Sequence, residues 1–272
     1  MRQIYVLVLA VCASVICMAQ EPLSGKFTVN AEGKQVQFAK GNLQYVPSTD
    51  TWQFAGSQTE IIGKDAEYVT ANPSYSGAID LFPWDDNYGA HIGEGWRLLT
   101  DDEWQYLLRE EEIGSGPENV GQATIGTQRG LMLVPDEWED PAGLKFTPSP
   151  NTNWSTETNY YTSANWTTTL EPSGAVFLPC VGETNSYWSS TSNGDSEAYN
   201  MYFSGSAIAA NNPAACTQTY AVRLVKDYTD TPTGVENVQR DNVQCTKVLR
   251  DGQIYLMYKG TMYNVQGKAV NR

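Results

Sequence analysis

The chain offers few residue types for acid–base or nucleophilic catalysis. Its 272 residues include a single histidine, His91, which lies in the glycine-rich stretch 87–93. There is no Cys-x-x-Cys, His-Glu-x-x-His or histidine-rich tract. Most zinc sites and the Ser-His and Cys-His catalytic arrangements need histidine, so the sequence excludes them unless His91 serves alone. Because no serine or cysteine nucleophile signature lies near it, we interpret His91 as a surface or loop-packing residue.

Acidic residues in two turn-like stretches have the chemistry of calcium ligands. Asp85 and Asp86 precede an asparagine, and Asp195 and Glu197 lie in an Asn-Gly-Asp-Ser-Glu run. Calcium prefers hard oxygen ligands of this kind, although neither stretch has the spacing of an EF-hand loop, so solvated turns without a cofactor are the alternative. A second use of carboxylates is a glycosidase pair such as Asp85 with Glu94, which would need a carboxyl separation of roughly 5 to 9.5 Å.

Aromatic residues are plentiful, and tyrosine and tryptophan exceed phenylalanine. A flat ring with a polar handle suits stacking on sugars, and it also suits packing in a core. The stretch 147–174 is rich in Thr, Asn, Ser and Pro, which favours exposure of the rings within it. We therefore predict a glycan-binding platform from four rings of this stretch and one from a later strand: Trp154, Tyr160, Tyr161, Trp166 and Tyr202.

The first 19 residues have the pattern of a secretory signal peptide. Arg2 supplies a positive charge, residues 4–16 are mainly apolar, and small residues lead up to Ala19. The apolar run is shorter than the roughly 20 residues that a spanning helix needs. Lipidation of Cys17 is an alternative, but a bulky isoleucine precedes it where lipidation requires a small residue. We predict an exported chain that begins at Gln20, has no membrane span and is found on the outer surface or outside the cell.

The net charge of −14 bears on the choice of partner. Nucleic-acid phosphates require a basic face, so this acidic chain is not expected to bind nucleic acid. An acidic surface suits a soluble exported protein.

Alternating apolar residues predict two β-hairpins near the beginning of the mature chain. Residues 27–29 and 36–38 form the arms of the first, around a turn at 31–34. Residues 43–45 and 52–54 form the arms of the second, around Pro47–Asp50.

One helix is predicted to follow. Thr100 and Glu103 have the spacing of a capping box, and acidic residues occupy the first turn. Trp104, Leu107 and Leu108 recur at helical spacing and should form one buried face. The helix is predicted to end at Arg109.

Short strands dominate the rest. We expect one at 131–134 and four more at 175–181, 187–191, 198–203 and 220–226, arranged as an antiparallel meander. Residues 71–95 are predicted to be a loop, and 229–234 a linker. The tail after the linker has the pattern of a small hairpin, which is too short to build a core easily.

Three motifs resemble a known family when taken together and in this order. They are Trp-Arg-Leu-Leu-Thr-Asp-Asp-Glu-Trp at 96–104, Tyr-Trp-Ser-Ser-Thr at 187–191 and Tyr-Ala-Val-Arg-Leu-Val at 220–225. Residues 25–227 resemble the Fibrobacter succinogenes major paralogous domain family. The resemblance implies an α+β, C-type-lectin-like fold with mostly short antiparallel strands, long loops and one or two helices, related to the formylglycine-generating-enzyme architecture. The resulting domains are a signal peptide at 1–19, the lectin-like domain at 20–228 and a linker with a C-terminal β segment at 229–272.

The resemblance does not imply an enzyme. Formylglycine-generating enzymes hold copper with a reactive cysteine pair near the end of the domain, and the closing strand 222–225 has no cysteine. Ergothioneine-type relatives hold iron with several histidines, and this chain has one. The Glu-Pro-Asn and Trp-Asn-Asp motifs of sugar-binding C-type lectins are missing too, so the resemblance does not support sugar binding through calcium.

The same resemblance implies a disulfide. In C-type lectins, a cysteine before the central tryptophan strand pairs with one in the loop before the last strand, and Cys180 and Cys216 occupy matching positions. An exported protein meets the oxidising conditions that such a bridge needs. Two buried thiols are the alternative. Cys245 would then be left over, or would pair between chains.

The tail resembles a different group of sequences. Residues 247–255 and 263–268 are similar to the C-terminal sorting segments of secreted proteins from Bacteroidota, which are associated with type IX secretion or surface attachment. The resemblance makes the secretion machinery a partner of the tail. A last hairpin of the preceding domain is the alternative.

These observations favour a non-enzymatic secreted or cell-surface binding module, whose ligand is a glycan or an envelope or host protein. An adhesin or fibre-tip subunit is the first alternative. A variant of it is a retroelement-diversified binding protein, which the alanine-rich stretch 207–215 and the following tail make a poor fit. The glycosidase that would use Asp85 and Glu94 is the second alternative.

Overall fold

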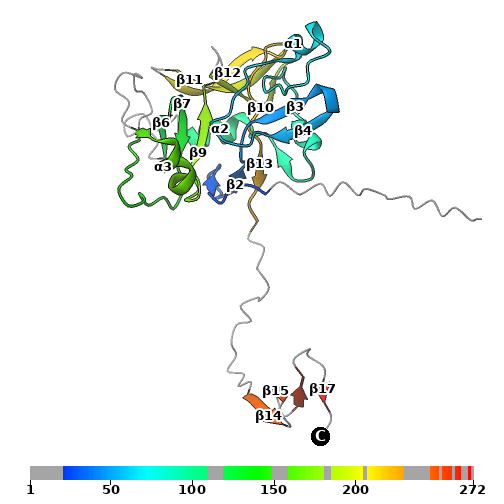
Figure 1. Ribbon diagram of the computed structural model, residues 1–272, viewed down its shortest axis with the longest axis vertical. Coiled ribbons are helices and arrows are strands. Elements are labelled where there is room, and N and C mark those ends of the chain that lie inside the picture. The colour runs from blue at the N-terminus through cyan, green and yellow to red at the C-terminus, as the bar shows by residue number, and fades with distance from the viewer. Residues whose placement is uncertain are drawn as a thin grey trace, which may run out of the picture. The chain divides into compact units, whose positions relative to one another are not determined.

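The structure, a computed structural model, describes residues 21–108, 119–148, 159–180, 185–204 and 207–229, and in the tail 246–250, 253–258, 261–264 and 269–270. It divides into two compact units, Met1–Thr229 (unit 1) and Asp230–Arg272 (unit 2) (Figure 1). The division falls where the predicted linker begins. The predicted signal peptide, Arg109, Trp154 and Cys245 lie outside the described residues.

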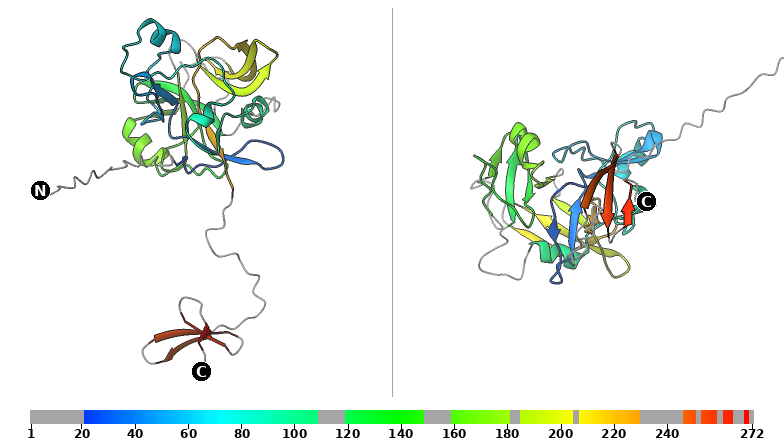
Figure 2. Two further views of the ribbon diagram at one scale, coloured as in Figure 1. Left: turned by 90° about the vertical axis from the view of Figure 1, so that its right-hand side faces the viewer. Right: turned by 90° about the horizontal axis from the view of Figure 1, so that it is seen from below.

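Unit 1 is a mixed α+β structure of mostly antiparallel strands in several sheets, with few helices. Within the described ranges, no helix is both long and apolar enough to cross a membrane. The β6–β7–β9 sheet with α3 and the β3–β4 hairpin lie on different sides of unit 1 (Figures 1 and 2).

The first sheet brings both ends of unit 1 together. Its strand order is β1 (Phe27–Thr28), β2 (Gln35–Phe38), β13 (Val225–Asp227) and β5 (Trp96–Arg97), and all of its pairings are antiparallel. Phe27 lies opposite Val36, so the first predicted hairpin forms. The last strand of the unit therefore lies between an early strand and a central one.

The second predicted hairpin is also confirmed. Strands β3 (Leu43–Val46) and β4 (Thr51–Phe54) pair around the short 3-10 helix η1 (Pro47–Thr49). The chain after this hairpin contains a short helix α1 (Ala66–Ala71), which was not predicted, and the 3-10 helix η2 (Tyr88–His91), which lies within the predicted loop 71–95. The side chain of Asp65 caps α1 by accepting the N–H of Tyr68 at 2.9 Å.

A four-stranded sheet of order β8-β6-β7-β9 has core on both faces. It comprises β6 (Val120–Ile125), β7 (Gln128–Leu133), β8 (Asn159–Tyr161) and β9 (Val176–Pro179), with β6 and β8 parallel. One face packs into the main core of unit 1 through Leu131 and Leu178. The other packs against Trp166 and Leu170 of the π-helix η4 (Trp166–Leu170), which follows the short helix α3 (Ser163–Asn165).

The predicted four-strand meander is only partly correct. Strands β10 (Ser186–Asn193), β11 (Glu197–Phe203) and β12 (Ile208–Ala215) form a three-stranded antiparallel sheet. The expected first strand is β9, which pairs with β7, and the expected last strand supplies β13. Strand β12 was not predicted, because Ile208 is its one β-branched residue and the remainder is alanine, asparagine and proline, which are depleted in strands.

Helix α2 (Asp101–Leu108) begins as its sequence predicts. The N–H of Glu103 donates to Oγ1 of Thr100 at 3.1 Å, and the N–H of Thr100 donates to Oε2 of Glu103 at 3.0 Å. These two bonds are the capping box. Trp104, Leu107 and Leu108 are buried in the main core, which confirms the predicted face.

A buried arginine connects several elements of unit 1. Arg223 is 1% exposed, and its guanidinium donates to Oδ1 of Asn42 at 3.0 Å and to the carbonyl of Phe177 at 2.9 Å. It also donates to the carbonyl of Ala39 at 3.2 Å and to Oε1 of Gln58 at 3.3 Å. Burial lowers the pKa of Arg223 to about 10, so the group is still charged at neutral pH.

Unit 2 is a small antiparallel sheet. Its strands β14 (Thr246–Arg250), β15 (Gln253–Tyr258), β16 (Thr261–Tyr263) and β17 (Ala269–Val270) pair in sequence order. The predicted hairpin is therefore extended to four strands.

Candidate functional site

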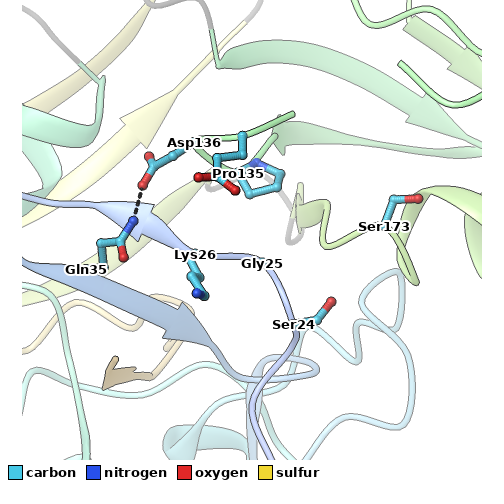
Figure 3. A pocket seen from close by; sticks show the side chains of 8 residues that line it. Ser24, Gly25, Lys26, Gln35, Pro135, Asp136 and Ser173 are labelled. Carbon is cyan, nitrogen blue, oxygen red and sulfur yellow. Dashed lines mark hydrogen bonds between the residues drawn. The ribbon is translucent and has the colours of Figure 1, made fainter. Parts of the chain in front are cut away.

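A polar cleft of about 220 Å³ opens where the first described residues of the chain cross the end of β7. Four segments line it: residues 24–26, Gln35 of β2, residues 135–137 and Ser173 (Figure 3). Almost all of the side chains that line it are polar. The exception is the ring of Pro135.

Two glycines allow the crossing that forms the cleft. A Cβ atom on Gly25 would overlap the carbonyl oxygen of Gly174, so only glycine fits there. Gly174 itself has a φ of +95°, a conformation that other residues rarely adopt. The N–H of Asp136 also donates to the carbonyl of Lys26 at 3.0 Å. The segment 24–26 is thus fixed through its backbone to Gly174 on one side and to Asp136 on the other.

Asp136 holds the floor of the cleft in place. Its carboxylate accepts the N–H of Thr28 at 3.0 Å and the hydroxyl of Thr28 at 2.8 Å. It also accepts Nε2 of Gln35 at 2.7 Å, the bond drawn in Figure 3. Three of the four hydrogen bonds that a carboxylate ordinarily accepts are therefore made within the protein.

Three side chains in the cleft, those of Ser24, Glu137 and Ser173, have polar groups that are open to a ligand. The hydroxyls of Ser24 and Ser173 and the carboxylate of Glu137 make no hydrogen bond or ion pair with another residue of the described ranges, and all three residues are exposed. The ammonium of Lys26 lies 4.0 Å from the centre of the Tyr228 ring, and this contact orients it. Hydroxyls and a carboxylate beside a small apolar ring suit a ligand with several hydroxyl groups.

The predicted aromatic platform does not form as a unit. Trp166 is 1% exposed and packs on Phe177, with ring centres 5.7 Å apart, so its assignment as a ligand-binding residue is wrong. Tyr161 is 7% exposed, and its hydroxyl donates to the carbonyl of Lys145, so the assignment fails there as well. The polar composition of this stretch concealed a helical pair, Trp166 and Leu170, which is spaced to face a core.

The other predicted aromatic residues lie apart from one another in the fold. Tyr160 of β8 is 63% exposed. Tyr202 is half-buried on β11, in a different sheet. Trp154 lies outside the described residues. Among the four candidates that the structure describes, only Tyr160 has the exposure that stacking requires.

The acidic calcium candidates fall into two separate places. Asp85 and Asp86 precede η2, and Oδ1 of Asp85 accepts the N–H of Asn87 at 2.8 Å. Asp195 and Glu197 lie at the turn from β10 to β11. In the described ranges, no three side chains of His, Cys, Asp or Glu gather as a metal site. Calcium at either place stays a prediction. The proposed glycosidase pair, Asp85 and Glu94, flanks η2.

The predicted disulfide is wrong, since no bond joins Cys180 to Cys216. The N–H of Cys216 donates to the carbonyl of Ser196, at the turn between β10 and β11. Cys180 lies near the other end of that sheet, where the preceding Pro179 accepts the hydroxyl of Tyr187 at 2.8 Å. The seven residues of β11 separate these ends by about 20 Å, far beyond the reach of a disulfide. Strand β9 was predicted to be the first strand of the meander, but it pairs with β7 in another sheet.

His91 packs as the sequence suggests. It is exposed, and its ring stacks on Trp52 with centres 4.2 Å apart and an interplanar angle of 14°. Trp52 also contacts Tyr45, Phe82 and Tyr88. These contacts fasten the loop around η2 to the β3–β4 hairpin.

Sequence reasoning missed the cleft. Its residues come from four segments that no local pattern connects, and the glycine pair at 25 and 174 is the one signal of a close backbone crossing.

No family model matched the chain, and neither did any curated protein or solved structure.

Proposed function

We propose that the chain is an exported, non-enzymatic binding protein, and that unit 1 binds a glycan with one sugar ring in the polar cleft. The observation that carries this proposal is the set of open hydrogen-bonding groups, Ser24, Glu137 and Ser173, on a backbone fixed by Asp136. An envelope or host protein is the other class of ligand that the sequence favours. The glycan is preferred because the cleft is small and most of the side chains that line it are polar.

The chemistry of the cleft matches a sugar ring. Adjacent hydroxyls of a sugar both donate and accept, and Glu137 and the two serines offer acceptors and donors to them. Hydrogen bonds to a charged carboxylate are stronger than those between neutral groups. The ring of Pro135 offers an apolar surface to the C–H face of the sugar. The cleft volume of about 220 Å³ is that of a small binding site.

We also propose a C-type-lectin-like fold for unit 1 and a delivery role for unit 2. The order of the three motifs, now found in β5 with α2, in β10 and around β13, supports the first. The resemblance of the tail to sorting segments, and its folding as a unit of its own, support the second. Export itself is supported by the signal-like first 19 residues.

The test of the binding proposal starts from the mature chain, residues 20–272, on a glycan array. Hits are then measured by calorimetry with the wild type and with a double variant, Ser24→Ala with Glu137→Gln. We expect the double variant to bind at least about tenfold more weakly, because it loses one charged and one neutral hydrogen bond. The matched control is Glu139→Gln, which changes an exposed carboxylate outside the cleft and should keep wild-type affinity.

Two results would contradict the proposal. One is an array without specific binding, or hits that the double variant binds as tightly as the wild type does. The other is a cleaved product in the ligand recovered after incubation, since turnover would favour the carboxylate-based glycosidase. Mass spectrometry of the recovered ligand distinguishes binding from cleavage.

A further inference from the structure

The strand register places three polar side chains in one row across the β8-β6-β7 sheet. Thr124 of β6 lies opposite Tyr160 of β8 on one side and opposite Arg129 of β7 on the other. Residues directly opposite each other in neighbouring strands point to the same face of a sheet. We call Tyr160, Thr124 and Arg129 the edge row.

The edge row lies where an apolar face of the sheet ends. Along the same face, two residues further on β7, Leu131 enters the main core of unit 1. Within the row the burial changes: Thr124 is 7% exposed, Tyr160 is 63% exposed and Arg129 is exposed. The row therefore has an exposed tyrosine and an exposed arginine on either side of a buried threonine.

The spacing of the row suits a short oligosaccharide. Neighbouring strands are about 4.8 Å apart, so Tyr160 and Arg129 are about 10 Å apart across the sheet, which is long enough for linked sugar rings. The row and the cleft are separate places. Arg129 is the second residue of β7, and Pro135 lies six residues after Arg129, beyond the end of the strand and about 20 Å away along it.

The chemistry of the row indicates the kind of sugar. A tyrosine ring stacks on the C–H face of a sugar, and a guanidinium forms paired hydrogen bonds with a carboxylate. Because the whole chain carries a charge of −14, a long polyanion would be repelled by the remaining surface. A short chain needs only the local positive charge.

We propose that the edge row binds a short acidic oligosaccharide, with one sugar ring on Tyr160 and a carboxylate on Arg129. This inference rests on the proposed function in that the ligand is a glycan, but it uses none of the residues of the cleft.

The test uses trigalacturonic acid and its methyl ester, which has the same rings without the charge. The variants are Tyr160→Ala, Tyr160→Phe and Arg129→Gln in the mature chain, each checked for an unchanged melting temperature. We expect Tyr160→Ala to weaken binding of both probes at least about fivefold, because the stacking ring is removed. Tyr160→Phe keeps the ring and should stay within about twofold. Arg129→Gln should abolish the preference for acid over ester, which we expect to be about tenfold in the wild type.

The control is Tyr68→Ala, which removes the other exposed tyrosine of the described domain and should bind both probes as the wild type does. Wild-type binding by Tyr160→Ala, or an unchanged acid preference in Arg129→Gln, would overturn the inference, as would a wild type that binds neither probe. The variant Ser24→Ala with Glu137→Gln separates the two proposals. If this double variant loses binding of trigalacturonic acid while Tyr160→Ala and Arg129→Gln keep it, the edge row is refuted. If the double variant binds trigalacturonic acid normally while Tyr160→Ala does not, the edge row is supported independently of the cleft.

Discussion

At the scale of single residues, Arg223 shows how a strand pattern can hide a polar centre. In the closing segment, Val222 and Leu224 face one core cluster while Ala221 and Val225 face the other. The alternation therefore places Arg223 in the middle of an apolar face. Its charge is compatible with burial because its donors meet oxygens from several segments, and because Gln58 connects it to Glu171 through a hydrogen bond of 3.2 Å.

Replacing Arg223 with methionine should destabilise unit 1 by about 2–5 kcal/mol, because buried acceptors lose their donor. The substitution keeps an apolar side chain of similar length, but it leaves the carbonyls of Ala39 and Phe177 buried without their donor. Urea denaturation followed by tryptophan fluorescence measures the change in the free energy of unfolding. Lys40→Met is the control, because it removes an exposed cation next to Ala39 and should have little effect. Equal stability of the two variants would contradict the prediction.

The residues of the candidate site were harder to predict from the sequence than those of the core. Exposure of Tyr160 was predicted, but the same argument from a polar stretch failed for Trp166, because burial depends on what packs against a ring and not on its sequence neighbours. Ser24 and Ser173 both line the cleft although more than half of the domain separates them in sequence. Only the register of the strands revealed that Arg129 and Tyr160 share a row.

At the scale of elements, a charged network connects α2 to the first sheet. The guanidinium of Arg97 on β5 donates to Glu103 at 2.6 and 2.8 Å and to Asp227 of β13 at 2.6 Å. Lys34 adds an ion pair with Glu103 at 3.1 Å. Burial by itself would raise the pKa of Glu103. The hydrogen bonds from Arg97 and the Thr100 N–H, together with the charge of Arg97, outweigh it and lower this pKa.

This lowered pKa predicts a loss of stability in acid. In the unfolded chain Glu103 takes up its proton near pH 4.5, and in the folded protein it does so at a lower pH. Its contribution is therefore complete above pH 4.5 and is lost as the pH falls through the folded pKa. We expect Glu103→Gln to be about 1–3 kcal/mol less stable than the wild type at pH 7, and to lose less of its remaining stability between pH 7 and acid.

Thermal melts at a series of pH values test this expectation, with Asp102→Asn as the control. Asp102 is an exposed acid in the same first turn, so its variant should keep the acid dependence of the wild type. A Glu103→Gln variant with the wild-type acid dependence would show that the network does not stabilise the fold.

Elements defined by local contacts were predicted best. Both early hairpins and α2 follow from alternation, turn residues and the Thr100–Glu103 box, because each depends on residues close in sequence. The partners of β9 and β13 depend on contacts across the whole domain, which no local pattern encodes. Strand β12 lacks intrinsic strand preference and is stabilised by pairing with β11.

At the scale of the whole molecule, the boundary between the units can be tested by truncation. A chain that ends at Thr229 keeps β13 and should melt cooperatively at the temperature of the full chain. A chain that ends at Leu224 lacks β13 and leaves β2 and β5 without their shared partner, so it should not melt cooperatively. Calorimetry of both chains decides the matter, and cooperative melting of the shorter one would refute the role of β13.

The same truncation tests export and delivery in the native host. We expect the full chain at the outer surface or in the medium with Gln20 as its first residue, as N-terminal sequencing would show. The chain that ends at Thr229 should fold but should not reach the surface. Normal delivery without unit 2 would contradict its sorting role, and a lipid on Cys17 would contradict the predicted cleavage site.

The place of β13 also determines when unit 1 can fold. Its pairing of Val225 with Phe38 closes a loop of nearly the whole unit, and contacts between such distant residues form slowly. The first sheet is incomplete until Asp227 has been synthesised, because its third strand comes last in the chain. A newly made chain therefore remains without its native sheet through most of its synthesis. If the chain is exported as we propose, this delay would leave it unfolded while it passes through a translocation channel.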